Sequence, residues 1–179
     1  MVDWTAPKTW DSSGLTASDM NTHIRDNLLA LSEPPSAVGN PDANYTTSNT
    51  AWTNVDGGDV EGVFKHTLET FGRDVTVNFV GMVGHSASVT GSVLFNISID
   101  GAADYVVDDG ITGLYTNSSA TIFPISFSFV IPAADITAGT HVIRLRWKSS
   151  SASNTCTLYA GGGSAGRDVH GQFIVRESS

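Results

Sequence analysis

Residues 122–131 read Ile-Phe-Pro-Ile-Ser-Phe-Ser-Phe-Val-Ile, and this stretch decides the fold. Every odd-numbered residue from 123 to 131 is phenylalanine or isoleucine, whereas Pro124, Ser126 and Ser128 stand between them. Successive side chains of an extended strand point to opposite faces, so a period of two places all the large apolar groups on one side. The stretch therefore predicts a β-strand with one face in a core and the other toward solvent.

The same alternation recurs along the chain from about residue 45 onward. We expect strands near residues 50–55, 62–71, 75–79, 93–99, 123–131, 143–147, 155–160 and 169–176. Turn signals stand at 56–58, 100–101, 109–110, 138–139 and 161–163, where Asp-Gly, Ala-Gly and Gly-rich runs occur. About eight short strands with one apolar face each predict an antiparallel β-sandwich. Their order resembles a jelly roll of the tumour-necrosis-factor or carbohydrate-binding-module kind.

Composition agrees with a mainly β protein and limits its partners. The chain has 179 residues, of which 40% are hydrophobic and 15% charged, enough for one domain with a full core plus an arm. The net charge is −9, and the lysines and arginines are scattered. Binding to nucleic acid needs a basic face, so we expect no nucleic-acid partner. No apolar run approaches the roughly 20 residues that span a bilayer, so we expect no membrane partner.

A single amphipathic helix is predicted over residues 16–31, ahead of the strands. Thr16 stands at the N-cap with Asp19 three residues on, a relative of the capping box. A narrow apolar stripe follows, formed by Met20, Ile24, Leu28 and Leu31. A helix of about this length is marginal in water by itself. The stripe must therefore dock on the chain's own sheet, on a second copy, or on a larger assembly.

Three further residues of the N-terminal region are candidates for contacts. Asn27 falls beside the stripe, where it could fix the register and oligomeric state of a helix bundle, or could bond the local backbone. Trp4 and Trp10 lie in an arm, residues 1–15, that has no periodicity. Large aromatic residues are enriched at interfaces, so these tryptophans cover either the chain's own β-domain or a partner.

These features divide the chain into three parts. Residues 1–32 form the arm and anchoring helix, residues 33–44 a Pro/Gly linker, and residues 45–179 the jelly-roll domain. Pro34 and Pro35 end the helix and stiffen the linker.

The N-terminal fifth of the chain also resembles a known family. The run Trp10-Asp11-Ser12-Ser13-Gly14-Leu15, followed by Asn21, Ile24-Arg25-Asp26-Asn27 and Leu31, is similar to a pattern in structural proteins of tailed bacteriophages. Those proteins include tail-fibre-like, head-fibre and capsid-decoration proteins. The family pattern carries an acidic residue before the capping threonine, where this chain has Gly14-Leu15. The resemblance implies a virion component that is anchored through its N-terminal helix.

Candidate chemical motifs are weak in this sequence. Residues 162–166 spell Gly-Gly-Ser-Ala-Gly, like a nucleophile elbow, but no helical pattern follows, so a hairpin loop is expected. The five histidines have no metal-site spacing, and the acidic groups 56–61 and 104–109 lack the ligand order of an EF-hand. Cys156 is expected to be a small buried apolar residue. We therefore name no catalytic, cofactor-binding or metal-binding residue.

The functional expectation is a non-enzymatic structural protein of a tailed-phage virion. It would be a capsid decoration (cement) protein or a short head or tail fibre, a homotrimer that contacts other virion proteins. The alternative is a carbohydrate-binding or host-adhesion module for a surface glycan, which needs a row of exposed aromatics; an esterase or glycosidase ranks third. The candidates for that row are Tyr45, Tyr105, Tyr115 and Tyr159. No secretory signal is visible, so we expect synthesis in the host cytoplasm.

Overall fold

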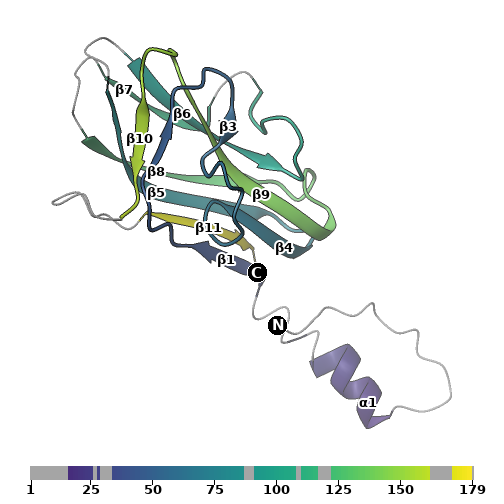
Figure 1. Ribbon diagram of the computed structural model, residues 1–179. Coiled ribbons are helices and arrows are strands. Elements are labelled where there is room, and N and C mark those ends of the chain that lie inside the picture. The colour runs from purple at the N-terminus through teal and green to yellow at the C-terminus, as the bar shows by residue number, and fades with distance from the viewer. Residues whose placement is uncertain are drawn as a thin grey trace.

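Two antiparallel β-sheets pack face to face and enclose a single core (Figure 1). The structure is a computed structural model, and it describes residues 16–25, 28, 34–86, 91–107, 110–116, 122–161 and 171–178. The prediction of a mainly β sandwich that follows one short helix is confirmed.

The first sheet is built around the long strand β5 (Val75–His85). On one side β5 pairs with β8 (Ile122–Ile131) along almost its whole length. On the other side it pairs first with β11 (Gln172–Glu177) and then with β10 (Cys156–Tyr159). Strand β1 (Ser36–Gly39) extends the sheet beyond β11, and β2 (Tyr45–Thr47) extends it beyond β10.

The second sheet is built around β9 (Ala138–Ser149), which is one residue longer than β5. One side of β9 pairs with β4 (Lys65–Phe71) and with the short β3 (Thr53–Asn54). The other side pairs with β6 (Gly91–Ile99), which in turn pairs with β7 (Thr112–Thr116).

The strand order is that of a jelly roll. Setting aside the short strands β2, β3 and β10, eight strands remain. Numbered along the chain, they lie in the order first, eighth, third, sixth in one sheet and second, seventh, fourth, fifth in the other. The chain changes sheet at every step except from the fourth strand to the fifth. This is the double Greek key that defines the jelly roll, and it confirms the predicted fold.

The core is filled from the faces that the alternation predicts. Phe79 of the first sheet packs against Phe95 of the second, with ring centroids 5.2 Å apart, and Phe95 packs against Trp147 at 6.1 Å. All three side chains are almost completely buried. Offset and edge contacts of this kind add to the free energy gained from burying the rings. Cys156 is buried in the same core, as predicted.

Three strands were not predicted from the sequence: β1, β2 and β7. Strand β1 lies inside the segment 33–44, for which we predicted a linker, and pairs with β11 from Ser36↔Arg176 to Gly39↔Phe173. The sheet therefore begins before residue 45. These three strands have three to five residues and contain no run of alternating large apolar residues, and β1 is recognised only through its partner.

One predicted turn is wrong. Ala138 and Gly139 are the first residues of β9, where they pair with Phe71 and Thr70. The chain turns earlier, in the segment 132–137 between β8 and β9. Gly139 has a φ of 141°, which a residue with a side chain rarely adopts, so this glycine serves a bend at the strand start. The predicted turn at Asp100-Gly101 is confirmed, because both residues have positive φ values of 54° and 72°.

A buried carboxylate holds the two ends of the domain together. Glu177 is completely buried, and its oxygens accept hydrogen bonds from the backbone N–H groups of Phe71 and Arg73 at 2.7–3.0 Å. Its own N–H donates to the carbonyl oxygen of Pro35 at 3.0 Å. The last strand is thus tied both to the β4–β5 turn and to the start of β1.

Replacing Glu177 by Ala should therefore destabilise the domain. The change leaves two backbone N–H groups without their acceptor, at a cost of about 1–3 kcal/mol each when the donors are buried. We expect the free energy of unfolding to fall by about 3 kcal/mol in urea denaturation followed by tryptophan fluorescence. The matched control is Asp42→Ala, which removes an exposed carboxylate and should change stability by less than about 0.5 kcal/mol. Equal effects of the two substitutions would contradict this role of Glu177.

Candidate interaction surfaces

The N-terminal helix begins with the predicted cap. In α1 (Ala17–Met20) the Thr16 hydroxyl accepts a hydrogen bond from the Asp19 N–H at 3.1 Å. The Asp19 carboxylate in turn accepts from the Thr16 N–H at 3.2 Å and from its hydroxyl at 2.6 Å. This reciprocal pair is a capping box, and it satisfies donors that a helix start otherwise leaves free.

The helix does not continue as a regular α-helix. Residues Asn21–Arg25 form a π-helical segment, η1, which differs from the single α-helix that we predicted. Asn21, His23 and Ile24 are weaker helix formers than alanine or leucine, so the propensity for a regular helix is low here. π-Helical turns are rare and occur frequently at functional sites.

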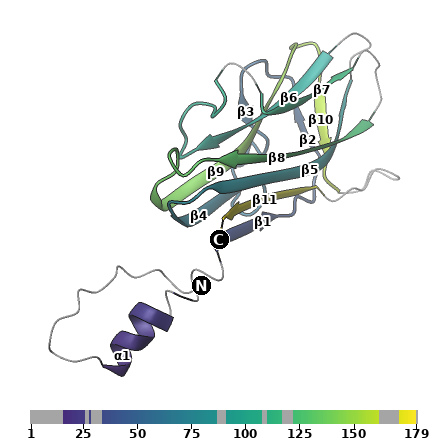
Figure 2. The same cartoon turned by 180° about the vertical axis from the view of Figure 1, so that it is seen from behind.

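The apolar stripe of this helix faces solvent. Met20 is 41% exposed, Ile24 39% and Leu28 61%. Figures 1 and 2 show α1 apart from the sandwich in two opposite views. The other candidate contact residues, Trp4, Trp10, Asn27 and Leu31, lie outside the described residues. The structure thus brings the stripe residues to one exposed helix without a covering element of the sandwich.

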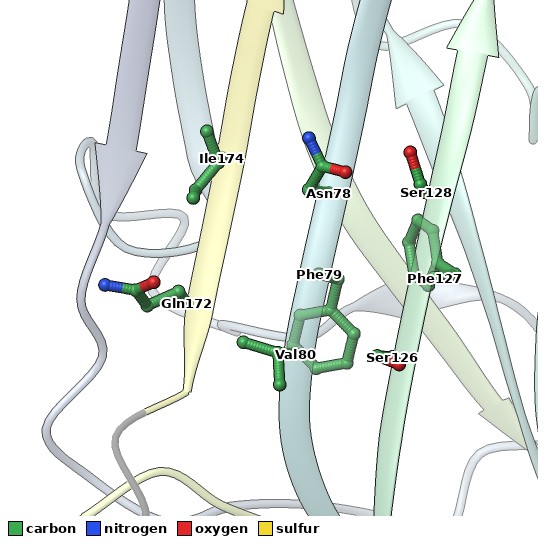
Figure 3. A pocket seen from close by; sticks show the side chains of 8 residues that line it. All are labelled: Asn78, Phe79, Val80, Ser126, Phe127, Ser128, Gln172 and Ile174. Atoms are coloured by element: carbon green, nitrogen blue, oxygen red, sulfur yellow. The ribbon is translucent and has the colours of Figure 1, made fainter.

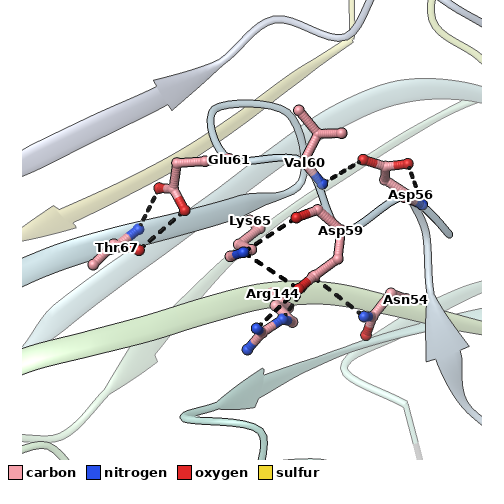
Figure 4. A network of polar contacts seen from close by, with 9 residues as sticks. Asn54, Asp56, Asp59, Val60, Glu61, Lys65, Thr67 and Arg144 are labelled. Atoms are coloured by element: carbon pink, nitrogen blue, oxygen red, sulfur yellow. Dashed lines mark hydrogen bonds and ion pairs between the residues drawn. The ribbon is translucent and has the colours of Figure 1, made fainter.

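The outer face of the second sheet is charged and covered by loops. The loop 55–64 folds over β9 and is held by Asp59. Its carboxylate accepts two hydrogen bonds from the Arg144 guanidinium, at 2.7 and 3.0 Å (Figure 4). Lys65 pairs with the same carboxylate at 3.3 Å. A hydrogen bond from the Arg144 guanidinium, reinforced by Lys65, holds the pKa of Asp59 below its usual value.

The neighbouring acids of this loop also have structural partners. Asp56 accepts hydrogen bonds from the N–H groups of Gly58 and Val60 at 2.9 and 2.8 Å, and Glu61 accepts from the Thr67 N–H and hydroxyl at 2.6 and 3.0 Å (Figure 4). Their carboxylates accept hydrogen bonds from the protein and do not converge on one position where a cation could bind. The arrangement closes a loop and provides no oxygen cage for calcium.

A second loop covers the rest of this outer face. Asn96, completely buried on β6, donates to the carbonyl oxygen of Val106 at 2.8 Å and accepts from the N–H of the same residue at 3.2 Å. Arg146 pairs with Asp104 at 2.6 Å. The loop that follows β6 is thereby fixed over its own sheet.

The outer face of the first sheet is different, because no loop within the described ranges covers it and it is almost uncharged. Along the rows that cross β11, β5 and β8, Gln172, Val80 and Ser126 lie side by side, and so do Ile174, Asn78 and Ser128. These residues line a shallow hollow of about 430 Å³ (Figure 3). Of all the outward positions on β1, β11, β5 and β8, only Arg176 carries a charge.

Sequence reasoning missed this surface. It used the inward residues of each strand to find the core and treated the outward ones as ordinary solvent-facing positions. A signal was present, because the residues between the large apolar ones in 122–131 are Pro, Ser, Ser and Val, with no charge among them.

The remaining candidates are dispersed in the fold. His66 is buried, stacks on Phe173, and contacts its carbonyl oxygen at 3.0 Å; burial lowers its pKa. His141 lies between the Asp100 carboxylate at 2.7 Å and the Thr137 carbonyl oxygen at 2.9 Å. Among the described residues, no three His, Cys, Asp or Glu side chains gather where a metal ion could bind. Burial raises the pKa of the Cys156 thiol, which therefore stays protonated and unreactive.

The four tyrosines do not form a glycan-binding row. Tyr45 packs edge-on against Phe64 at 5.1 Å, and Tyr105 hydrogen-bonds to Asp135. Tyr115 is 71% exposed, whereas Tyr159 is only half-buried on another strand of the other sheet. Residues 162–166, with Ser164, and His170 lie outside the described residues. Within the described part of the chain, no helix is long and apolar enough to cross a membrane.

Comparisons with known proteins give distant structural likenesses. No protein-family model matches the chain, and no curated protein matches it. A structure of infectious bursal disease virus, Gx strain, aligns with a TM-score of 0.43 and 15% identity over 80% of this chain and 36% of that chain. A mutant of VP2 from the same virus, in derived T=1 particles, aligns with a TM-score of 0.40 and 15% identity, over 80% of this chain and 36% of that chain. The VP2 subviral particle of this virus aligns with a TM-score of 0.39 and 13% identity, over 80% of this chain and 37% of that chain.

This chain thus spans little more than a third of the length of the structures that it matches. The assignment of the jelly roll rests on the strand order itself, which the hydrogen-bonded pairs define.

The Asp59 ion pairs predict an acid-dependent stability. Because the folded-state pKa of Asp59 is lower than its unfolded-state value, ionised Asp59 adds stability above the unfolded-state pKa. That contribution is lost as the pH falls through the lower folded-state pKa. We expect Asp59→Asn to lower the free energy of unfolding at pH 7, and the difference from the wild type to shrink toward pH 2. Urea denaturation at several pH values measures this, and a difference that grows on acidification would contradict it.

Proposed function

We propose that this protein is a non-enzymatic structural component of a tailed-phage virion. Residues 1–32 attach it to the particle, and the jelly roll is displayed. It acts as a capsid decoration protein or as a short head or tail fibre. The observation that carries this proposal is the capped helix whose apolar stripe is exposed beside a sandwich that is already complete.

The sandwich has its own core and does not need the helix. Its two sheets bury large side chains from both inner faces, among them Phe79, Phe95, Phe173 and Trp147, and the loop before β4 adds Phe64. The buried core cluster contains none of the helix residues that the structure describes. The domain from β1 to β11 therefore has what an independently folding unit requires.

The helix, in contrast, needs a partner. Isolated helices of fewer than about 12–15 residues are marginal in water, and most helical stability in proteins comes from packing of an apolar face. Met20, Ile24 and Leu28 offer such a face, which is roughly half exposed in this chain. We infer that another virion protein, or the helices of neighbouring copies, covers it.

The class of assembly comes from the resemblance of the first fifth of the chain to tailed-phage structural proteins. Helices with an apolar stripe can bundle at the base of a symmetric oligomer, and closed rotational symmetry is the rule for such assemblies. We propose a homotrimer in which Asn27 sets the register of the helices. Trp4 and Trp10 add contacts with the particle.

Deletion of residues 1–32 tests the division of labour. The truncated chain keeps Pro35 and β1, so it should fold with the circular dichroism spectrum of a β-sandwich and an unchanged melting temperature. It should fail to co-sediment with particles that lack the full-length protein. Wild-type occupancy of the particles by the truncated chain would place the attachment surface in the sandwich instead.

A double substitution, Ile24→Asp with Leu28→Asp, tests the stripe within the full chain. Burial of unpaired carboxylates is strongly unfavourable, so we expect binding to particles to weaken by roughly 100-fold or more. The matched control is Ser18→Asp with Thr22→Asp, which has the same spacing and charge but which the helical period of the sequence assigns to the side opposite the stripe. The control should bind as the wild type does, and equal losses in both variants would show that net charge, not the stripe, governs attachment.

A further inference from the structure

The two outer faces of the sandwich differ in a way that the core does not require. The second sheet carries Lys65, Arg144 and Arg146, and two loops cover it through ion pairs. Among the described residues, no loop covers the hollow of Figure 3 in the first sheet, and the outward positions of β1, β11, β5 and β8 hold one charged residue, Arg176. None of the 18 acidic residues of the chain stands at an outward position of β1, β11, β5 or β8.

Apolar side chains are exposed across this face. Val38 on β1 is 49% exposed, Val80 on β5 42%, and Val130 on β8 49%. Between them lie small hydroxyl and amide side chains that line the hollow. The three valines lie in different rows of the sheet, Val38 in the row of Ser128, Val80 in that of Ser126 and Val130 in that of Thr76. They are single apolar groups on a face whose other residues are mostly polar and uncharged, so the lack of charge, not a continuous apolar patch, distinguishes this face.

The rim of the same face is an unprotected strand edge. Among the described residues, β8 pairs only with β5, so its other edge is free. Natural edge strands are blunted with charges, bulges or proline, because an exposed edge invites pairing with another chain. The ten residues of β8 include no charge, and Pro124 is their only such device. The face and its edge therefore form one continuous surface whose strands carry a single outward charge, that of Arg176.

We propose that this surface, the outer face of β1, β11, β5 and β8 with the free β8 edge, is where a second copy of the chain packs. The charge of the chain is the reason for choosing a second copy as the partner that binds here. Each chain carries a net charge of −9, so two copies repel each other wherever carboxylates meet. This surface has none, and in a twofold contact the same patch lies on both sides, so no carboxylate of the patch meets another. Such a contact is separate from the threefold contact proposed for the helices.

The size of the surface is of the order that such a contact needs. Strands β5 and β8 have 11 and 10 residues, β11 has six and β1 has four. At about 4.8 Å between strands and about 3.4 Å per residue, the face projects to roughly 500 Å² before the β8 edge is added. Each partner of a stable interface contributes about 800 Å² of accessible surface, and the edge and the relief of the side chains add to the projected area. A strongly basic partner would instead be recognised by carboxylates, which this surface lacks.

The test places a carboxylate on the surface and measures the mass of the full-length chain in solution. Light scattering and analytical ultracentrifugation at 1–100 μM should show an oligomer for the wild type. Val80→Asp and Val130→Asp should each weaken association by at least 10-fold, because the charge is apposed to a copy of like charge. The matched control is Val107→Asp, whose parent side chain is 71% exposed in the loop after β6 and which should associate as the wild type does.

Each outcome decides the proposal. A monomeric wild type at 100 μM, unaltered association of both surface variants, or an equal loss in the control overturns it. Since Val80 and Val130 are already half exposed, the variants should melt within a few degrees of the wild type. If either variant unfolds, Ser128→Arg replaces it, because it adds a charge at the hollow without removing an apolar group. A second measurement is the amide hydrogen exchange of β8 in the wild type across the concentration range. Protection of the β8 amides that does not increase with the fraction of oligomer would overturn the proposal.

The inference is separable from the proposed function. Attachment is tested by the stripe variants of the helix, and self-association by the variants of the sheet. A chain that forms oligomers through the sheet but never joins particles would refute the virion role alone.

Discussion

The pairing of β5 is the interaction on which the rest of the fold depends. Its eleven residues hydrogen-bond to β8 on one side and to β11 and then β10 on the other, so that three segments distant in sequence take their register from it. A shift of one residue would turn Phe79 outward and Asn78 into the core. The contact between Phe79 and Phe95 then fixes the second sheet over the first.

Because that register is set by burial on one face only, the other face of each sheet is free to vary. The second sheet uses this freedom for ion pairs and for loops that seal it, as Asp59 and Arg144 show. The outward residues of β1, β11, β5 and β8 are, apart from Arg176, uncharged, and several of them are exposed. The sandwich thus has one outer face that ion-paired loops cover and one outer face that the described loops leave exposed. The apolar stripe of the helix is a second exposed surface, near the N-terminus.

The parts of the structure that sequence reasoning predicted are those with a local physical signal. The alternation in 122–131, the capping box of Thr16 and Asp19, and the Asp100-Gly101 turn each arise from neighbouring residues and appear as predicted. Strand β1 and the buried Glu177 depend on partners more than a hundred residues away, and nothing near them in sequence shows it. The neutral face was readable only as an absence of charge spread over four separate strands.

The pairing of Ser36 with Arg176 brings the two ends of the sandwich to one place. The chain enters at β1 and leaves at β11, so whatever is fused after residue 179 begins beside the segment that leads to the helix. The turn between β9 and β10, at residues 150–155, lies at the opposite end of the long strand β9, about 35 Å away at the rise of an extended chain. For anyone who wishes to carry a foreign peptide on this scaffold, that turn points away from the helix, whereas a C-terminal extension would compete with it for space.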